Sequence, residues 1–250
     1  MNFEGGAWDG DGISSQTVFD GVASFSMPLG CALGLQLDAG AGSFDLGSAA
    51  GAGAHLFMRD PSSYLLGLHG TYESWNFDAP ATDVNFWTLA AEGELYLGNI
   101  SLEGEAGLVD ANVGSADFAG RLTAAYYLND DFRMALGVHQ LASYTTGIAS
   151  AEWQMDSMPL SLTLEGQMGE NGYQSATVGL KFYFGGEQKT LIRRHREDDP
   201  TDGLFNNQGG AATAGGVLGA GGNDCPSGKL QPNAFSCNSA SKPVNNCCPV

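Results

Sequence analysis

The chain has 250 residues, of which 37 are glycine and only 15% are charged, and this composition fits neither a disordered chain nor a helical membrane protein. Its 28 acidic and 10 basic side chains give a net charge of −18, which argues against nucleic acid as a partner. The apolar runs are too short for a membrane-spanning helix, so any membrane crossing has to use strands.

The charge and composition divide the chain into three parts. Residues 1–185 carry four basic and 22 acidic side chains, whereas residues 186–250 carry six of each. Residues 186–222 are charged at first and then rich in Gly and Ala, as in a flexible linker, and residues 223–250 contain four cysteines. We therefore predict one large domain over residues 1–185, followed by a linker and a cysteine-bearing segment.

Period-two alternation of apolar and polar residues runs through the first part and predicts strands. Turn-forming residues separate eleven such segments, and residues 2–8 supply a twelfth strand that would close an antiparallel barrel. Short connections alternate with longer ones around Phe44, Ala79, Asn112, Thr146 and Asn171, which is the pattern of periplasmic turns opposite external loops. The eleven segments are 16–27, 31–42, 49–59, 63–77, 84–97, 100–112, 116–128, 132–145, 149–156, 159–169 and 173–184.

The two faces of these strands differ sharply in polarity. One face carries no charge and includes Phe19, Leu89 and Leu136, while the other collects all four basic residues of this part of the chain. A soluble barrel would bury the apolar face, but strand length, small apolar-face residues and aromatic residues near strand ends favour a membrane barrel. The predicted fold is an all-β antiparallel transmembrane barrel of about 12 strands with a loosely structured C-terminal tail.

The segment TVGLKFYF at residues 177–184 resembles the last-strand assembly signal of porin-like outer-membrane β-barrels of Gram-negative bacteria. Its matching residues are Thr177, Gly179, Phe182 and Phe184. The resemblance implies an outer-membrane location, recognition by the assembly machinery, contact with the lipid bilayer and lipopolysaccharide, and leaves homo-oligomerisation open. With the short turns on the periplasmic side, the N- and C-termini are expected in the periplasm. No signal peptide follows Met1, so we expect the numbering to begin at the mature chain.

Four glutamates form the best-defined constellation. The tight turn at residues 98–99 should set Glu94 opposite Glu103 and Glu92 opposite Glu105 on the lumen side. Facing carboxylates repel, so they require counter-charges, bound cations or protonation. The patch is either an ion-paired network that fills the lumen or an acidic constriction that attracts cations. The other lumen charges predicted to belong to this network are Arg121, Arg133, Arg59, Glu165, Lys181 and Glu73.

Two functions fit this pattern. The first is a channel for passive passage of small solutes, with a cation preference from the acidic wall. Lumen glycines, among them Gly34 and Gly51, should leave space for it. The alternative is a closed structural barrel that acts as an outer-membrane anchor, adhesin or assembly subunit. Inward aromatic side chains would then fill the lumen; these are Phe57, Trp75, Phe86, Tyr96 and Tyr127.

Catalytic and metal-binding signals are weak. His69, Thr71 and Glu73 align on one face, but lumen filling explains them more simply than catalysis does. We therefore predict no enzymatic activity. His55 and His69 lie on neighbouring strands, yet two ligands rarely suffice for a metal, and no cofactor or metal is predicted.

The tail offers two further features. Its basic run at residues 193–196 is neutralised by the acidic residues that follow, so we expect a solvated segment near the periplasmic rim. Disulfides are predicted among the C-terminal cysteines in preference to a zinc site, with connectivity undetermined. These cysteines are Cys225, Cys237, Cys247 and Cys248.

Overall fold

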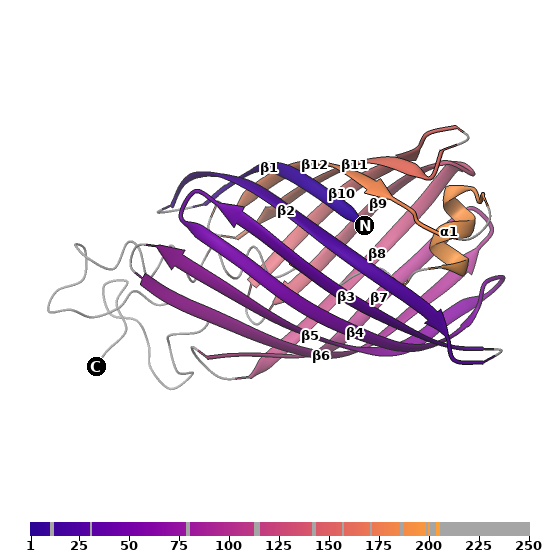
Figure 1. Cartoon of the computed structure of the whole chain (residues 1–250), viewed down its shortest axis with the longest axis horizontal. Helices are drawn as coiled ribbons and strands as arrows, with labels where there is room; N and C mark the ends of the chain where they lie inside the picture. Colours follow the sequence, from indigo (N-terminus) through magenta and orange to yellow (C-terminus); the bar gives the residue numbers. More distant parts are fainter. Residues whose placement is uncertain are drawn as a thin grey trace, which may run out of the picture.

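The computed structural model is a closed barrel of twelve strands in which every neighbouring pair is antiparallel (Figure 1). It describes residues 1–10, 13–30, 32–78, 81–112, 116–141, 144–156, 158–170, 172–185, 188–198, 200 and 204–205. The strands are β1 Asn2–Gly10, β2 Ile13–Pro28, β3 Leu33–Phe44, β4 Gly47–Asp60, β5 Tyr64–Asp78, β6 Ala81–Leu97, β7 Ile100–Ala111, β8 Asp117–Asn129, β9 Phe132–Leu141, β10 Tyr144–Gln154, β11 Leu160–Gly169 and β12 Gln174–Phe182.

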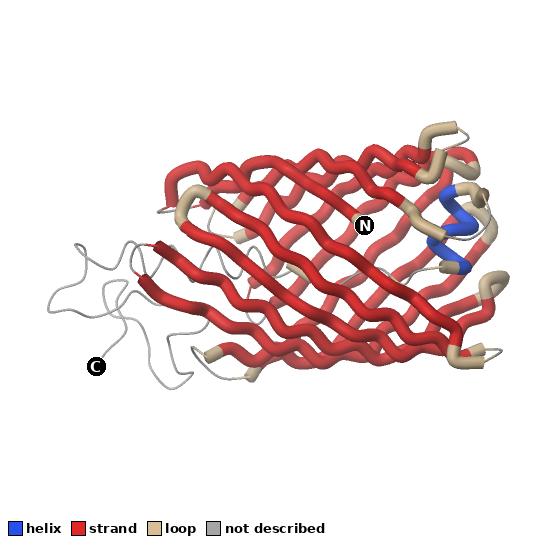
Figure 2. The backbone as a smooth tube through the Cα atoms, viewed as in Figure 1, coloured by secondary structure: helices blue, strands red, loops and turns tan. Residues whose placement is uncertain are grey.

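One helix, α1 (Leu191–Glu197), lies at one mouth of the barrel (Figure 2). We call this mouth the helix end; it contains the connection from β2 to β3 and every second connection after it. The opposite mouth, where β1 connects to β2, is the far end. Among the described residues, no helix is long and apolar enough to span a bilayer.

Closure of the barrel depends on the first strand. β1 pairs with β2 on one side and with β12 on the other, in a register that sets Asn2 opposite Lys181 and Asp9 opposite Gln174. Because every strand then has two partners, the barrel has no free edge along this seam. The prediction that residues 2–8 supply the twelfth strand is confirmed.

The outer face of the barrel is apolar. Leu89, Leu136 and Trp87 expose 67%, 69% and 62% of their surface, and an exposed Phe, Leu, Met or Val recurs at alternate positions around the wall. Charged side chains in the middle of the wall, such as Glu73, Glu92 and Glu152, are buried on the inner face, whereas Asp110 lies opposite the exposed Trp87 on the outer face near the far end. The predicted polarity is therefore confirmed, and it is inverted relative to a soluble barrel.

The far end differs from the prediction of long loops there. Phe44 ends β3 instead of lying in a loop, and only residues 45–46 connect it to β4. Thr146 lies inside β10, because Tyr144 and Thr145 already pair with Leu141 and Gln140 of β9. Alternation of inward aromatic and threonine side chains continues through both places, so the hydrogen-bond ladder continues too. Loop length consequently gives no distinction between the two ends of the barrel.

Candidate functional site in the barrel lumen

The four predicted glutamates face one another across β6 and β7. Glu92 is opposite Glu105, and Glu94 is opposite Glu103, as the two-residue turn between the strands requires. Glu92, Glu105 and Glu103 each contact an imidazole or guanidinium directly, while Glu94 accepts a hydrogen bond from the Tyr96 hydroxyl at 2.9 Å and lies within electrostatic range of Arg59. The repulsion between facing carboxylates is thus relieved by neighbouring side chains.

Two stacked histidines supply partners that the sequence reasoning missed. His55 and His69 are register neighbours on β4 and β5, and their ring centroids lie 5.1 Å apart with an interplanar angle of 12°. His55 Nδ1 is 2.8 Å from Glu92 Oε2, and His69 Nε2 is 3.1 Å from Glu105 Oε2. Strand parity put both rings in the lumen, but only the register showed that they sit beside the glutamates.

The third glutamate of the patch has an arginine. Arg133 on β9 reaches over β8 and donates from Nη2 to both carboxylate oxygens of Glu103, at 2.7 and 2.8 Å. Arg121 lies opposite Glu105 in the β7–β8 register, and its Nε is 3.4 Å from Thr123 Oγ1. Arg133 therefore carries the direct ion pair that neutralises Glu103.

The remaining predicted charges are also on the inner face. Arg59 lies within electrostatic range of Glu94, and Glu165 and Lys181 line the same cavity as Glu103 and Arg133. Glu165 accepts a hydrogen bond from Gln167, and Lys181 lies over the Tyr183 ring at 5.2 Å. Glu73 is fully buried, and its Oε2 accepts a hydrogen bond from Trp75 Nε1. The structure thus brings together the charges of β6, β7 and β9, whereas the role of the whole set as a pore lining stays a prediction.

The tail enters the lumen, contrary to the expectation of a solvated segment. Leu191 and Arg194 of α1 are 0% and 3% exposed. Arg194 donates from Nε to Gln154 Oε1 at 2.9 Å, and its guanidinium carbon is 4.7 Å from the Tyr183 ring centroid. The basic run complements an inner wall rich in carboxylates and tyrosines, and this complementarity is invisible in the local charge balance of the tail.

Other residues of α1 contact two strands and one turn at the helix end. Arg196 donates to the Gly98 carbonyl at 2.7 Å and lies over the Tyr96 ring at 4.9 Å. His195 Nε2 is 3.2 Å from Glu152 Oε2. Because these contacts come from β6, β10 and the β6–β7 turn, α1 spans the helix-end mouth.

Beyond α1 the chain continues toward the far end. Gln36 Nε2 on β3 donates to the Pro200 carbonyl at 3.4 Å, and the backbone N–H of Phe205 donates to Glu73 Oε1 at 3.2 Å. Leu204 and Phe205 are 4% and 5% exposed and belong to an apolar cluster that includes Trp8, Phe44, Trp75 and Phe86. We call residues 188–205, so far as they are described, the luminal segment.

The expectation that the lumen glycines leave empty space is wrong, because other side chains lie close to them. A Cβ added to Gly34 would lie 2.5 Å from the Phe57 ring, and one added to Gly40 would lie 2.7 Å from the Phe205 ring. A Cβ at Gly51 would meet Leu204 at 3.2 Å. Glycine is required here because other inner side chains occupy the volume beside it.

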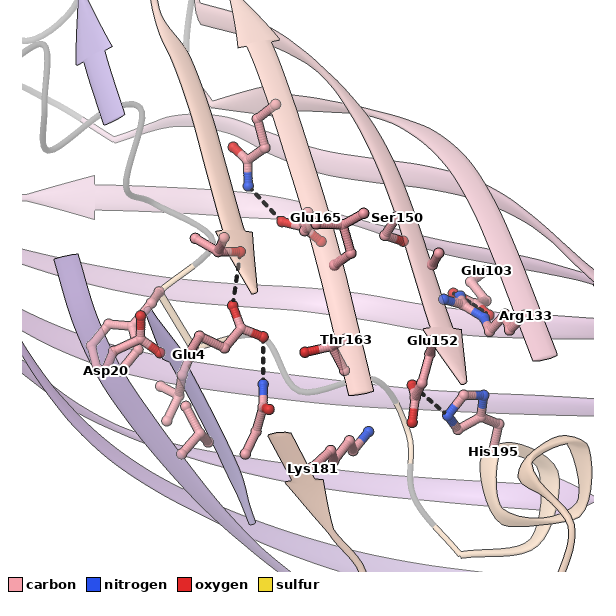
Figure 3. A pocket seen from close by; sticks show the side chains of 18 of the residues that line it. Glu4, Asp20, Glu103, Arg133, Ser150, Glu152, Thr163, Glu165, Lys181 and His195 are labelled. Atoms are coloured by element: carbon pink, nitrogen blue, oxygen red, sulfur yellow. Dashed lines mark hydrogen bonds and ion pairs between the residues drawn. The ribbon is translucent and has the colours of Figure 1, made fainter. Parts of the chain in front are cut away.

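A polar cavity of about 170 Å³ remains beside the luminal segment (Figure 3). Carboxylates and cations alternate in its walls, where Arg133 pairs with Glu103 and His195 with Glu152, and Leu204 and Phe205 also line it. Residues labelled in the figure that line it are Glu4, Asp20, Glu103, Arg133, Ser150, Glu152, Thr163, Glu165, Lys181 and His195.

The helix end also contains a charged cluster outside the strands. The Glu197 carboxylate accepts hydrogen bonds from Arg193, with Nε at 2.7 Å, and from Lys189, and these bonds lower its pKa. Burial opposes charge on Lys189, but hydrogen bonds to Asp198 and Glu197 raise its pKa overall. Both carboxylates are therefore already neutralised by cations of the same segment.

The other predicted site residues can be placed in part. Thr177 and Gly179 face the lumen on β12, and Phe184 is 76% exposed beyond its end. Their role as an assembly signal stays a prediction. The cysteines Cys225, Cys237, Cys247 and Cys248 lie outside the described residues, as does most of the predicted linker.

Comparison with known proteins gives structural matches only. No protein-family model matches the sequence, and no curated protein matches it in a sequence search. The KdgM porin in complex with oligogalacturonate has a TM-score of 0.54 and 12% identity, covering 74% of this chain and 100% of that one. An outer membrane channel from Pseudomonas putida F1 has a TM-score of 0.51 and 13% identity, covering 73% and 93%.

An enzyme has the same fold. Outer membrane phospholipase A from Escherichia coli matches with a TM-score of 0.54 and 12% identity, covering 73% of this chain and 89% of that chain. The prediction of no enzymatic activity, made from weak catalytic signals, is therefore wrong, because this fold includes both channels and a phospholipase. At such identities the likeness shows the fold and leaves the activity to the site.

Proposed function

We propose that this protein is an outer-membrane, porin-like channel for small polar solutes, held closed by its own luminal segment. An apolar outer face, a charged inner face and a fold like that of solved porins and channels support the location and the class. The observation that carries the proposal is the position of Arg194, His195, Leu204 and Phe205 inside the barrel.

Release of the luminal segment would not disturb the barrel wall. The segment contributes no strand to the closed sheet, and its contacts with the wall are side-chain packing, ion pairs and isolated hydrogen bonds. All twelve strand pairings can therefore persist when it leaves. The space it vacates would join the polar cavity of Figure 3.

A permanently closed barrel is the second candidate. Trp8, Phe44, Trp75 and Phe86 belong to the wall itself, and they pack together at the far end. Phe44 lies 5.8 Å from Trp75 and 6.3 Å from Trp8 between ring centroids. If these side chains stay together without Phe205, the barrel serves as an anchor, adhesin or assembly subunit.

Planar-bilayer recording separates the two candidates. The full chain would be compared with Leu204→Ser plus Phe205→Ser, which weakens the segment at its apolar contact. We expect rare openings for the wild type and sustained, larger conductance for the variant, with both proteins equally folded by heat-dependent gel mobility. Absence of conductance in both folded proteins would favour the closed barrel.

Cation preference is a finer part of the proposal. It rests on the excess of acidic side chains in residues 1–185 and on the glutamate patch of β6 and β7. In a salt gradient, the reversal potential of the opened variant should indicate cations. Adding Glu94→Gln and Glu103→Gln should move that potential toward zero, and an unchanged potential would remove the patch as the selectivity filter.

The orientation and partners are also proposals. We infer periplasmic termini, contact with lipopolysaccharide, recognition of residues 177–184 by the assembly machinery, and an oligomeric state that cross-linking in native membranes would determine. Protease access to a tag placed after Val250, in intact and permeabilised cells, tests the orientation of the C-terminus.

A further inference from the structure

The outward residues of β5, β6 and β7 change character at one row that crosses the three strands. Trp87 of β6 is opposite Tyr72 of β5 and opposite Asp110 of β7, and all three residues are exposed on the outer face. The next outward pair of β6 and β7 toward the helix end is Leu89 and Leu108, which are 67% and 60% exposed. The row therefore lies where the apolar band of the wall ends.

Beyond this row, toward the far end, the outward residues are polar. Ser74 of β5 is opposite Asn85 of β6, and Asn76 is opposite Asp83. Amide and carboxylate side chains are costly in hydrocarbon, so this part of the wall extends into the headgroup layer or the water. The row of Tyr72, Trp87 and Asp110 consequently lies at the boundary between acyl chains and headgroups.

The two aromatic residues of the row form one outward surface. Trp87 is 62% exposed, and the Tyr72 ring lies beside it with centroids 4.7 Å apart and an interplanar angle of 53°. The Tyr72 hydroxyl donates to Asn85 Oδ1 at 3.1 Å, and this bond holds the phenol ring next to the indole. The surface is therefore set in place before any ligand arrives.

Asp110 distinguishes this row from an ordinary aromatic girdle. Directly opposed residues of a strand pair have Cβ atoms about 4.5–5.5 Å apart, so the Asp110 carboxylate adjoins the Trp87 indole. The rim above it is tied together by Asn112, whose Oδ1 accepts from the Asn85 N–H and whose Nδ2 donates to the Asp83 carbonyl, each at 2.9 Å. An ionised carboxylate beside the hydrocarbon needs hydrogen-bond donors, and hydroxyl groups can supply them.

We propose that Tyr72, Trp87 and Asp110 bind the sugar headgroup of a membrane glycolipid. The negatively polarised face of an indole attracts C–H groups, and one face of a sugar ring presents several of them. Hydroxyls at the edge of the sugar donate to the Asp110 carboxylate, which would repel a phosphate headgroup. The acyl chains lie along Leu89 and Leu108, so the ligand is a lipid and not a soluble sugar.

The site rests on the proposed contact with lipopolysaccharide, itself a glycolipid, and names the residues that make it. With periplasmic termini the helix end faces the periplasm, because β12 ends there, and the row then lies on the outer side of the membrane, where lipopolysaccharide is. Binding at this outer surface does not require an open lumen. Loss of glycolipid binding would therefore leave the channel proposal standing, and absence of conductance would leave this site standing.

The test is native mass spectrometry of the full chain, released from mixed micelles with equal amounts of digalactosyl diacylglycerol and phosphatidylglycerol. We expect the wild type to retain mainly the galactolipid, and Trp87→Ala and Asp110→Ala each to retain about tenfold less of it. Trp153→Ala is the matched control and should retain as much as the wild type. Trp153 is an outward tryptophan, 46% exposed, but the residues opposite it are Leu162 and Phe132 and no carboxylate adjoins it.

Further comparisons separate sugar recognition from a structural role. Trp87→Tyr should restore most of the binding, and Asp110→Ala should shift the preference toward phosphatidylglycerol. Heat-dependent gel mobility checks that each variant is folded; if Trp87→Ala is not, Asp110→Ala decides alone. Equal retention of the two lipids by the wild type, or no less galactolipid on the folded variants than on Trp153→Ala, overturns the proposal. Displacement of the galactolipid by free galactose would overturn the assignment to a lipid.

Discussion

Replacement of Arg194 by alanine should loosen the luminal segment at its anchor. The side chain is 3% exposed, donates to Gln154 at 2.9 Å and lies over Tyr183 at 4.7 Å. A hydrogen bond from a charged donor contributes about 1.5–3 kcal/mol, and a desolvated cation–π contact contributes about 0.5–2 kcal/mol. A combined loss of about 3 kcal/mol would raise the ratio of undocked to docked helix about a hundredfold.

Arg193→Ala is the control for this change. Arg193 is the adjacent residue, but its side chain is 51% exposed and forms an ion pair with Glu197, four residues on in the same helix. Such pairs contribute about 0.3–0.5 kcal/mol, which is less than a threefold change in the same ratio.

The assay is limited chymotrypsin digestion of the folded protein, with cleavage after Phe205 quantified by mass spectrometry. Phe205 is 5% exposed while the segment is docked, so cleavage reports its release. We expect Arg194→Ala to be cut far faster than Arg193→Ala, which should resemble the wild type. Equal cleavage rates in the two variants would refute the assignment of Arg194 as the anchor.

Two further predictions concern packing and pH. Gly34→Ala should destabilise the barrel by about 1–3 kcal/mol, because its Cβ would lie 2.5 Å from the Phe57 ring. Gly93→Ala should be tolerated, since its nearest neighbour is at 3.6 Å, and equal denaturant midpoints for the two would contradict this account. The pKa of Glu197 is lowered by its hydrogen bonds, so its ionised carboxylate stabilises α1 fully at pH values above the ordinary pKa of 4.5. This stabilisation is lost as the pH falls through the lowered pKa. The backbone amides of residues 191–197, with exchange rates corrected for intrinsic rates, should therefore be less protected at acidic pH than at neutral pH. Equal protection at the two pH values would contradict a stabilising role for the Glu197 carboxylate.

Much of the barrel follows from alternation alone. Charged side chains that recur at every second position, with leucines between them, define an inside and an outside before any contact is known. The register of Glu94 opposite Glu103 follows from the two-residue turn at Gly98, where φ is +61°. Even the short strand at the N-terminus follows, because an odd number of strands cannot close an antiparallel barrel.

The contacts between side chains inside the lumen could not be predicted from this alternation. The pairing of His55 with Glu92 joins β4 to β6 across β5, and strand parity carries no information on which side chains meet across that distance. The inward contacts of the tail were harder still to predict. Its acidic residues balance the basic run in sequence, but in space they pair with Lys189 and Arg193. Arg194 meets Gln154 and Tyr183, which no local pattern connects to it.

The luminal segment also constrains the order of assembly. It follows the last strand in the chain, yet Phe205 lies inside a ring that closes only when β1 meets β12. Either the segment enters a completed ring through the helix-end mouth, or β1 and β12 join around a segment already in place. In the second route the segment acts as an internal template for closure, and weakening it would slow the final joining of the wall even though it contributes no strand.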